Sequence, residues 1–319
     1  MSQSNALKIN LVGSTTVGMV GEIADEVLIA RELEKQGCKV NFIPRDIWKA
    51  YCDGEWNDDW KKYLDDLNSN FNIICKWHAF DKEIYTKKLR EESGAITFYW
   101  VWDWMDGFPH GHDKMIKGCY LYLSNDVMHP QYKDILNKQY FPMDVADGDI
   151  PRQFEDKIYD VVFFGSCVGQ GLRTKWLPEI AKHCNLKIFA SNYQDWIKMG
   201  LNAEPAVYGD EFARKVSQSK ICLQFSVDDN TWGYWSNRIG KVLTQGGFLL
   251  AHYAPGMELF LRDGAEYFYD IEDCVNKINY YLENEQSRKM YENCGCMLSR
   301  YFTMEARIKD LLILRGNYA

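Results

Sequence analysis

Polar and cationic residues gather where short apolar runs of this 319-residue chain end or begin. The richest group is Tyr234 followed by Ser236, Asn237 and Arg238, directly before a run with helical periodicity. Serine and asparagine favour the N-cap of a helix, so Arg238 is expected in the first turn, where a positive charge opposes the helix dipole. A bound diphosphate would remove that conflict, because free N–H groups and a guanidinium neutralise it together without a metal ion. The alternative is a capped surface helix.

A second group follows the apolar run that ends at Phe164. Gly165 and Ser166 form a small, open loop, and Arg173 and Lys175 lie at the start of the next expected helix. Cations at that end of a helix are also unfavourable unless an anion binds there. A solvated charge pair explains them equally well. Lys241, in the helix that Arg238 opens, is a further candidate for contact with phosphate.

The glycine-rich segment from Gly13 to Gly21 includes Ser14 and Gly18 and separates an expected strand from a helix. Glycines let the backbone approach an anion closely, so Ser14 and Gly18 are candidates for contact with a phosphate-containing ligand. Neither the dinucleotide spacing GxGxxG nor a P-loop lysine is present. A tight strand-to-helix turn therefore explains the segment as well as a ligand-binding loop does.

Candidates for acid–base chemistry follow two strands of the first half. His78 ends the sequence Lys76-Trp77-His78, and Asp103 lies in the tryptophan-rich stretch from Trp100 to Asp106. Either side chain could act as a base toward an acceptor hydroxyl, although a single histidine among apolar residues is more often structural. We expect no metal site, because no third ligand is apparent near His110 and His112.

These residues are positioned by alternating strands and helices, which predict an α/β fold with two doubly wound Rossmann-like halves. Ligands in such folds bind beyond the carboxyl ends of the strands, and with two halves we expect the site in a cleft between them. Two domains are predicted. Residues 1–147 are expected to bind the acceptor of a transferred group, and residues 157–303 are expected to bind its nucleotide donor. A C-terminal helix at 304–319 is expected to pack back on the first domain.

The formal net charge of −8 argues against a protein that binds phosphate backbones in general, although it leaves room for a local basic cleft. The start of the chain is polar, and no apolar run approaches the roughly 20 residues that a membrane span needs. The ten cysteines are scattered without a pair of zinc-binding spacings, which favours reduced thiols and a cytoplasmic protein.

The second half resembles the GT-B glycosyltransferases of group 1, in particular the CgeB-like spore maturation proteins and phage-encoded glycosyltransferases. The matching residues are Ser236–Arg238, Gly246–Leu250, Pro255–Glu258, Phe260, Gly264–Glu266, Tyr280–Leu282, Arg288 and Phe302–Arg307. The resemblance implies a GT-B fold, a nucleotide-sugar donor held mainly by the second domain, no required metal or other cofactor, and a last helix that crosses back to the first domain. With the charge arguments above, we expect the donor to be held by Arg173, Lys175, Tyr234, Ser236, Asn237, Arg238 and Lys241.

One departure from the family's pattern concerns two glutamates, eight positions apart, that retaining GT-B enzymes often carry. Aligned on Gly246, those positions hold Gly233 and Lys241 here. The second glutamate usually holds the donor ribose, so the resemblance leaves the ribose contacts and the stereochemical outcome open.

The expected function is transfer of a sugar from a nucleotide diphosphate sugar to an acceptor hydroxyl. The expected donor is a UDP-sugar. The acceptor is either a hydroxymethylated pyrimidine in phage-type DNA or a surface glycan, spore glycan or small metabolite. A non-catalytic nucleotide-sugar-binding module and a GT-B-fold epimerase are the rivals. No membrane partner is expected, and the sequence does not indicate an oligomeric state.

Overall fold

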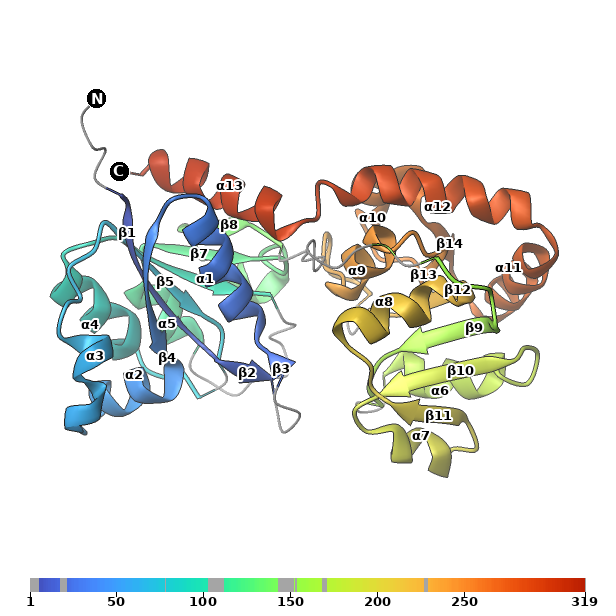
Figure 1. The fold of residues 1–319 in the computed structure, drawn as a ribbon, viewed down its shortest axis with the longest axis horizontal. Helices are drawn as coiled ribbons and strands as arrows, with labels where there is room; N and C mark the ends of the chain where they lie inside the picture. The colour runs from blue at the N-terminus through green and yellow to red at the C-terminus, as the bar shows by residue number, and fades with distance from the viewer. Residues whose placement is uncertain are drawn as a thin grey trace. The chain divides into compact units, whose positions relative to one another are not determined.

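The computed structural model describes residues 6–17, 22–77, 79–102, 112–142, 152, 154–167, 171–226 and 229–318. The chain forms two compact units, Met1–Met143 with Ile308–Ala319, and Asp144–Arg307 (Figure 1). The last helix, α13 (Met304–Gly316), therefore begins in the second unit and ends in the first. The predicted boundary between 147 and 157 falls largely outside the described residues, so those domain limits stay a prediction.

The first unit is built on a parallel sheet of six strands in the order β4-β1-β5-β6-β7-β8. Every residue of β5 and β6 is buried, as expected for the middle of a parallel sheet that is covered on both faces. The strands are β1 (Lys8–Gly13), β4 (Lys39–Pro44), β5 (Phe71–Cys75), β6 (Thr97–Val101), β7 (Leu121–Ser124) and β8 (Lys138–Tyr140), with a small hairpin of β2 (Thr16–Val17) and β3 (Glu22–Ile23).

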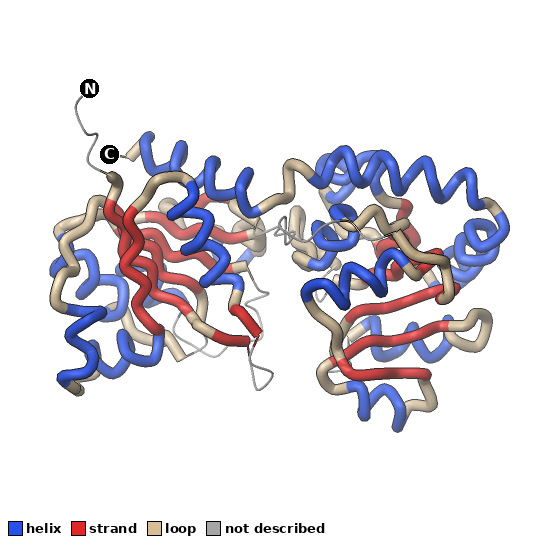
Figure 2. Tube along the Cα trace, in the orientation of Figure 1, coloured by secondary structure: helices blue, strands red, loops and turns tan. Residues whose placement is uncertain are grey.

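Helices flank these strands in the first unit (Figure 2). All but α3, which comes after α2, follow a strand in the alternation that the sequence predicts. They are α1 (Asp25–Lys35), α2 (Arg45–Cys52), α3 (Lys61–Leu64), α4 (Ile84–Ser93) and α5 (His112–Gly118). The end of α13 also contacts this unit, where Arg315 Nη2 donates to the Asn70 carbonyl at 3.4 Å. Tyr318, just after the helix, lies against the rings of Phe98 and Tyr120.

The second unit repeats the architecture with a parallel sheet in the order β11-β10-β9-β12-β13-β14. Its strands are β9 (Tyr159–Phe164), β10 (Leu186–Ala190), β11 (Asn202–Pro205), β12 (Ser219–Gln224), β13 (Leu249–His252) and β14 (Glu266–Phe268). Its helices are α6 (Leu172–Ile180), α7 (Tyr193–Lys198), α8 (Gly209–Ser217), α9 (Arg238–Thr244), α10 (Met257–Leu261), α11 (Ile271–Glu283) and α12 (Glu285–Ser299).

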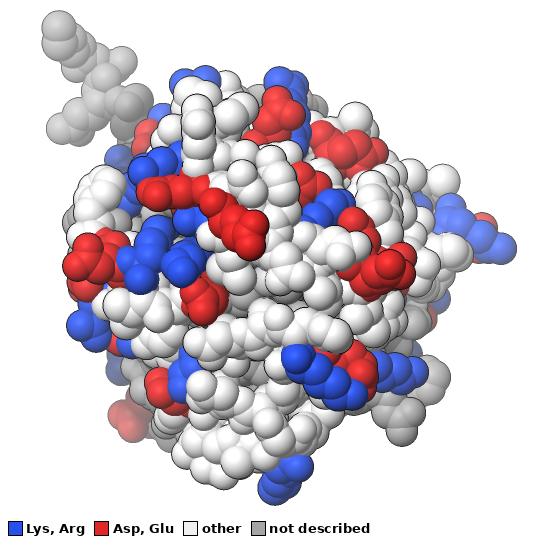
Figure 3. Space-filling view, turned by 90° about the vertical axis from the view of Figure 1, so that its right-hand side faces the viewer, with Lys and Arg blue, Asp and Glu red and all other residues white. Residues whose placement is uncertain are grey.

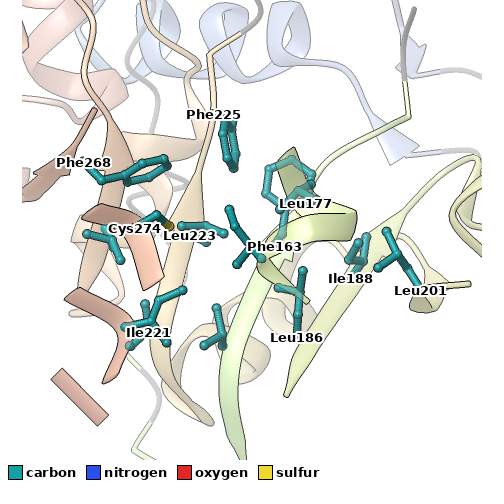
Figure 4. Close-up of a cluster of buried hydrophobic side chains, with 14 of the residues drawn as sticks. Phe163, Leu177, Leu186, Ile188, Leu201, Ile221, Leu223, Phe225, Phe268 and Cys274 are labelled. Atoms are coloured by element: carbon teal, nitrogen blue, oxygen red, sulfur yellow. The ribbon is translucent and has the colours of Figure 1, made fainter. Parts of the chain in front are cut away.

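A single apolar cluster holds one face of the second sheet against its helices (Figure 4). Phe163 on β9 and Leu223 on β12 come from neighbouring strands and are packed with Phe225, Phe268 and Leu177. Apolar burial of this extent is the main stabilising contribution in a domain of this size. It fixes β9 and β12 as the centre of the sheet, and their carboxyl ends as a rigid edge.

A row of amides crosses the first sheet at one level of the strands. Asn10 on β1 is in register with Asn41 on β4 and Asn72 on β5, and Asn72 is in register with Thr97 on β6. Asn41 Nδ2 donates to Asn10 Oδ1 at 3.0 Å, and Asn10 Nδ2 donates to Asn72 Oδ1 at 3.0 Å and to the Leu67 carbonyl at 2.7 Å. The row continues from Asn72 Nδ2 to Thr97 Oγ1 at 3.0 Å. These bonds satisfy buried polar groups and fix the register of four strands.

None of the helices among the described residues is long and apolar enough to cross a bilayer.

Replacing Asn72 with alanine should lower the free energy of unfolding by about 2–3 kcal/mol, because it leaves several buried partners without a hydrogen bond. Urea unfolding followed by circular dichroism measures the change. Asn68→Ala, at an exposed position of the preceding loop, is the matched control and should unfold like the wild type. Equal stability of both variants would contradict the structural role of the amide row.

Candidate functional site

The carboxyl end of β9 lies in the middle of the second sheet, between β10 and β12. Its loop is tied to the loop after β10 by three hydrogen bonds. The hydroxyls of Ser166 and Ser191 are 3.0 Å apart, the Cys167 N–H donates to Asn192 Oδ1 at 2.9 Å, and Asn192 Nδ2 donates to the Cys167 carbonyl at 2.6 Å. The loop that the sequence predicts to be open is therefore held at a defined position.

Arg238 reaches this strand end from the start of α9. Its Nη1 donates to the Phe164 carbonyl at 2.6 Å, across 74 positions of sequence. Its own backbone N–H donates to Ser236 Oγ at 3.4 Å, so Ser236 supports the helix start as the sequence predicts. The side chain crosses close above Gly165, where an added Cβ would lie 3.1 Å from Nη1 and 2.5 Å from the ring of Phe163. Gly165 therefore gives Arg238 the room to lie there.

Arg173 reaches the same strand end from the first turn of α6. It is only 5% exposed, and its Nη1 lies 3.4 Å from the Ser166 carbonyl, two residues beyond the carbonyl that Arg238 contacts. Burial lowers the pKa of Arg173, and the nearby Tyr234 and Cys167 oppose this effect. The side chain stays protonated, because an arginine pKa is too high to be crossed near neutral pH. No carboxylate of the described residues lies within 4 Å of it.

The structure thus brings Arg173, Arg238 and the buried Tyr234 together at one strand end. Both guanidinium groups approach carbonyls of the same strand end, two residues apart. An anion with two negative centres could accept hydrogen bonds from both forks. The arrangement is chemically suited to a diphosphate.

The loop that carries Tyr234 packs against the segment that follows β13. The Gly233 N–H donates to the Pro255 carbonyl at 2.8 Å, and the rings of Trp235 and Phe260 are 4.8 Å apart. Gly256 has a φ of 90°, and an added Cβ there would lie 2.8 Å from Trp232 Nε1. Tyr234 and Trp235 are buried, which makes this loop part of the core rather than a free surface loop.

The other predicted donor residues lie in different surroundings. Lys175 is exposed on α6, Asn237 is half-buried as the N-cap of α9, and Lys241 is half-buried within α9. Ser14 lies in the first unit, just beyond β1. Gly18, His78 and Asp103 lie outside the described residues, so their roles stay predictions.

A second polar cluster occupies the carboxyl edge of the first sheet. Lys76 Nζ lies 5.1 Å from the centroid of the Trp102 ring, and Arg45 Cζ lies 4.9 Å from the centroid of the Trp77 ring. The buried Glu26 lies close enough to both cations for them to influence its pKa. Lys76 and the tryptophans were expected at this edge, whereas Glu26 and Arg45 were not, because an acid and a base at helix starts resemble ordinary surface charges.

His252 is another residue that the sequence did not single out. It ends β13, is 8% exposed, and has its Nδ1 3.8 Å from Asp229 Oδ2. Its ring stacks on Phe225 at 5.8 Å and meets the edge of Trp176 at 5.1 Å. Burial lowers its pKa against the opposing influence of Asp229. Among the described residues, no group of three or more histidine, cysteine, aspartate or glutamate side chains could hold a metal ion.

Comparison with known proteins gives two findings. Residues 173–313 match the family model described as glycosyl transferase-like. No curated protein sequence matches this one.

Solved structures share the fold along nearly the whole chain. Sucrose-phosphate synthase from Thermosynechococcus elongatus is similar with a TM-score of 0.65 at 10% identity, covering 98% of this chain and 99% of its own. The Anabaena protein HepE in complex with UDP and glucose has a TM-score of 0.63 at 11% identity, covering 98% and 100%. The DNA-modifying enzyme β-glucosyltransferase, solved with and without its substrate uridine diphosphoglucose, has a TM-score of 0.62 at 13% identity, covering 96% and 98%.

The predicted fold class is confirmed, since two six-stranded parallel sheets with helices match GT-B structures. The resemblance to GT-B glycosyltransferases of group 1 is confirmed as well. The narrower CgeB-like assignment stays a prediction.

Gly165→Ala should lower the free energy of unfolding by about 1–3 kcal/mol, because the added methyl group has no room between Phe163 and Arg238. Urea unfolding measures the loss. Gly316→Ala is the control, since an added Cβ there meets nothing within 4 Å. A wild-type unfolding midpoint for Gly165→Ala would mean that this strand end relaxes without cost.

Proposed function

We propose that this chain is a glycosyltransferase that moves a sugar from a nucleotide diphosphate donor, a UDP-sugar in the first instance, onto an acceptor hydroxyl. The observation that carries the proposal is the meeting of Arg173 and Arg238 at the carboxyl end of β9. The family match over 173–313 supports it, because that range contains both arginines. The choice of a UDP-sugar is supported by the UDP and uridine diphosphoglucose bound by two proteins of this fold.

In the proposed reaction, the acceptor oxygen forms a bond to the anomeric carbon of the sugar, and the bond from that carbon to the diphosphate oxygen breaks. The electron pair of the broken bond stays on the leaving nucleotide diphosphate, where negative charge grows. Arg173 and Arg238 stabilise that charge from fixed positions, which is usually a large part of catalysis. We propose that the two guanidinium groups do this without a metal ion, with Ser236, Asn237, Tyr234 and Lys241 as further donor contacts.

The proton of the acceptor hydroxyl must pass to a base. Asp103 and His78 are the proposed candidates, because in the sequence His78 comes shortly after β5 and Asp103 shortly after β6. A carboxylate or a neutral imidazole can take such a proton near neutral pH. Ser14, which follows β1, and Gly18 are proposed as further donor contacts.

We propose a hydroxymethylated pyrimidine in DNA as the acceptor, with a surface or spore glycan or a small metabolite as the alternative. The DNA-modifying β-glucosyltransferase of the same fold supports the first choice. The net charge of −8 limits it, and on the face drawn in Figure 3 acidic and basic side chains are interspersed. Contacts to a phosphate backbone would therefore have to come from another, more basic surface.

A non-catalytic module that binds a nucleotide sugar is the alternative, and one observation supports it. Both positions where retaining GT-B enzymes often carry a glutamate lack one here. The first is Gly233, with a φ of 74°, and the second is Lys241. Hydrolysis of UDP-glucose in the absence of an acceptor would argue for an enzyme, and interconversion of free nucleotide sugars would instead indicate an epimerase.

Arg238→Ala should reduce kcat at least tenfold, because one of the two groups that stabilise the leaving diphosphate is lost. Steady-state kinetics with UDP-glucose and acceptor measure the change. Arg214→Ala is the matched control, because Arg214 lies on the exposed side of α8 in a pair with Glu211. Full activity of Arg238→Ala, with a melting temperature like the wild type, would remove this residue from the donor site.

Incubation with radiolabelled UDP-glucose should label duplex DNA that contains 5-hydroxymethylcytosine and leave the same duplex with plain cytosine unlabelled. A gel-shift assay at low salt should detect the complex, because phosphate contacts strengthen as salt falls. The plain duplex is the internal control for labelling. An absence of both binding and label would dismiss DNA and leave the glycan or metabolite acceptor.

A further inference from the structure

A polar pair lies at the carboxyl edge of the second sheet, where β13 ends. His252 is 8% exposed, and its Nδ1 lies 3.8 Å from Oδ2 of Asp229, which belongs to the loop after β12. That distance is too long for a direct hydrogen bond, and it leaves both atoms able to bond to a third group. The Asp229 side chain is 27% exposed, so a ligand can reach its carboxylate from solvent.

Aromatic rings hold the imidazole of His252 in place. Phe225, directly after β12, stacks on it with ring centroids 5.8 Å apart, and Trp176 meets it edge-on at 5.1 Å. The ring also has a backbone hydrogen bond with Tyr269. An imidazole packed in this way has little freedom to turn away from Asp229, so the pair has a fixed geometry before any ligand binds.

The pair lies near the strand end where the diphosphate is proposed to bind. β12 separates β9 from β13, so two strand spacings, about 10 Å, lie between the ends of β9 and β13. Helix α6 connects the two places, because it carries Arg173 in its first turn and Trp176 one turn later. A sugar ring bonded to a diphosphate at β9, together with the side chains that contact both, bridges an interval of this size.

The chemistry of the pair suits hydroxyl groups. A carboxylate accepts hydrogen bonds from hydroxyls and repels phosphate, so Asp229 is not a further phosphate contact. Burial lowers the pKa of His252, with Asp229 and the Tyr269 backbone opposing the shift, so the ring is uncharged near neutral pH. A neutral imidazole has one donor and one acceptor, which matches a hydroxyl better than an anion.

We propose that Asp229 and His252 bind adjacent hydroxyl groups of a sugar ring that is bonded to the donor's diphosphate. The carboxylate that contacts these hydroxyls then comes from the loop after β12 rather than from α9. The inference rests on the proposed function, because it adds contacts to that function's donor. Both the ribose of the nucleotide and the transferred sugar carry such hydroxyls, and binding measurements separate the two.

Isothermal titration calorimetry with the full chain and no acceptor tests the inference. Asp229→Asn should raise the Kd of UDP-glucose about tenfold, because the hydroxyl then donates to a neutral amide oxygen instead of a carboxylate. His252→Phe keeps a packed ring without its nitrogens and should weaken binding by a similar factor. Asp263→Asn is the matched control, because Asp263 is exposed just before β14, at the opposite edge of the sheet.

Two further ligands identify the ring that the pair contacts. A loss of affinity in Asp229→Asn that is seen with UDP-glucose and not with UDP assigns the pair to the transferred sugar. An equal loss with UDP-glucose and UDP that is absent with 2′,3′-dideoxyuridine diphosphate assigns it to the ribose. Either pattern supports the inference.

An unchanged Kd of UDP-glucose in Asp229→Asn would overturn the recognition of hydroxyls by this pair. An equal loss with all three ligands would overturn it too, because the dideoxy nucleotide lacks the hydroxyls in question. A wild-type protein that binds none of the ligands would overturn the proposed function together with this inference. The expected binding pattern without sugar transfer to any acceptor would overturn the transferase alone and leave the hydroxyl site in place.

Discussion

The contact between Arg238 and the Phe164 carbonyl is the interaction on which the second unit's site depends. It joins the start of α9 to the end of β9, and the lack of a side chain at Gly165 leaves room for the guanidinium beside it. Arg173 then approaches the carbonyl two residues further on. A parallel sheet brings all its carboxyl ends to one edge, so two arginines 65 positions apart in sequence reach the end of the same strand.

The two sheets place cations in different surroundings at their carboxyl ends. In the first unit, Arg45 and Lys76 each lie over an indole ring. In the second unit, Arg173 and Arg238 each approach a backbone carbonyl oxygen at the end of β9. A carbonyl orients a guanidinium, and it offsets the positive charge only in part. The diphosphate proposed above would add a full negative charge at that strand end.

The alternation of strands and helices, and with it the fold class, could be predicted because buried parallel strands are nearly continuous apolar runs. Arg238 at a helix start could be predicted from Ser236 and Asn237 before it. Glu26 could not, because Asp25-Glu26 at a helix start reads as two solvated acids, and only the packing against Gly13 buries one of them. The amide row could not be predicted either, since Asn10, Asn41 and Asn72 become neighbours only when the strands are in register. The short strands β8, β11 and β14 gave too few residues for a pattern.

The backbone conformation at Gly233 explains why one of the two glutamates of the family's pattern is missing here. Its φ of 74° lies in the left-handed region, and its N–H is held by the Pro255 carbonyl. A glutamate at this position would be strained, because a side chain with a Cβ rarely adopts that conformation. The neighbouring Trp232 is packed on Gly256, which itself has a φ of 90° and no room for a Cβ. Gly233 and Gly256 thus permit one loop shape, in which Tyr234 and Trp235 are buried. In the proposed function, a glutamate contact to the donor is therefore not available at position 233.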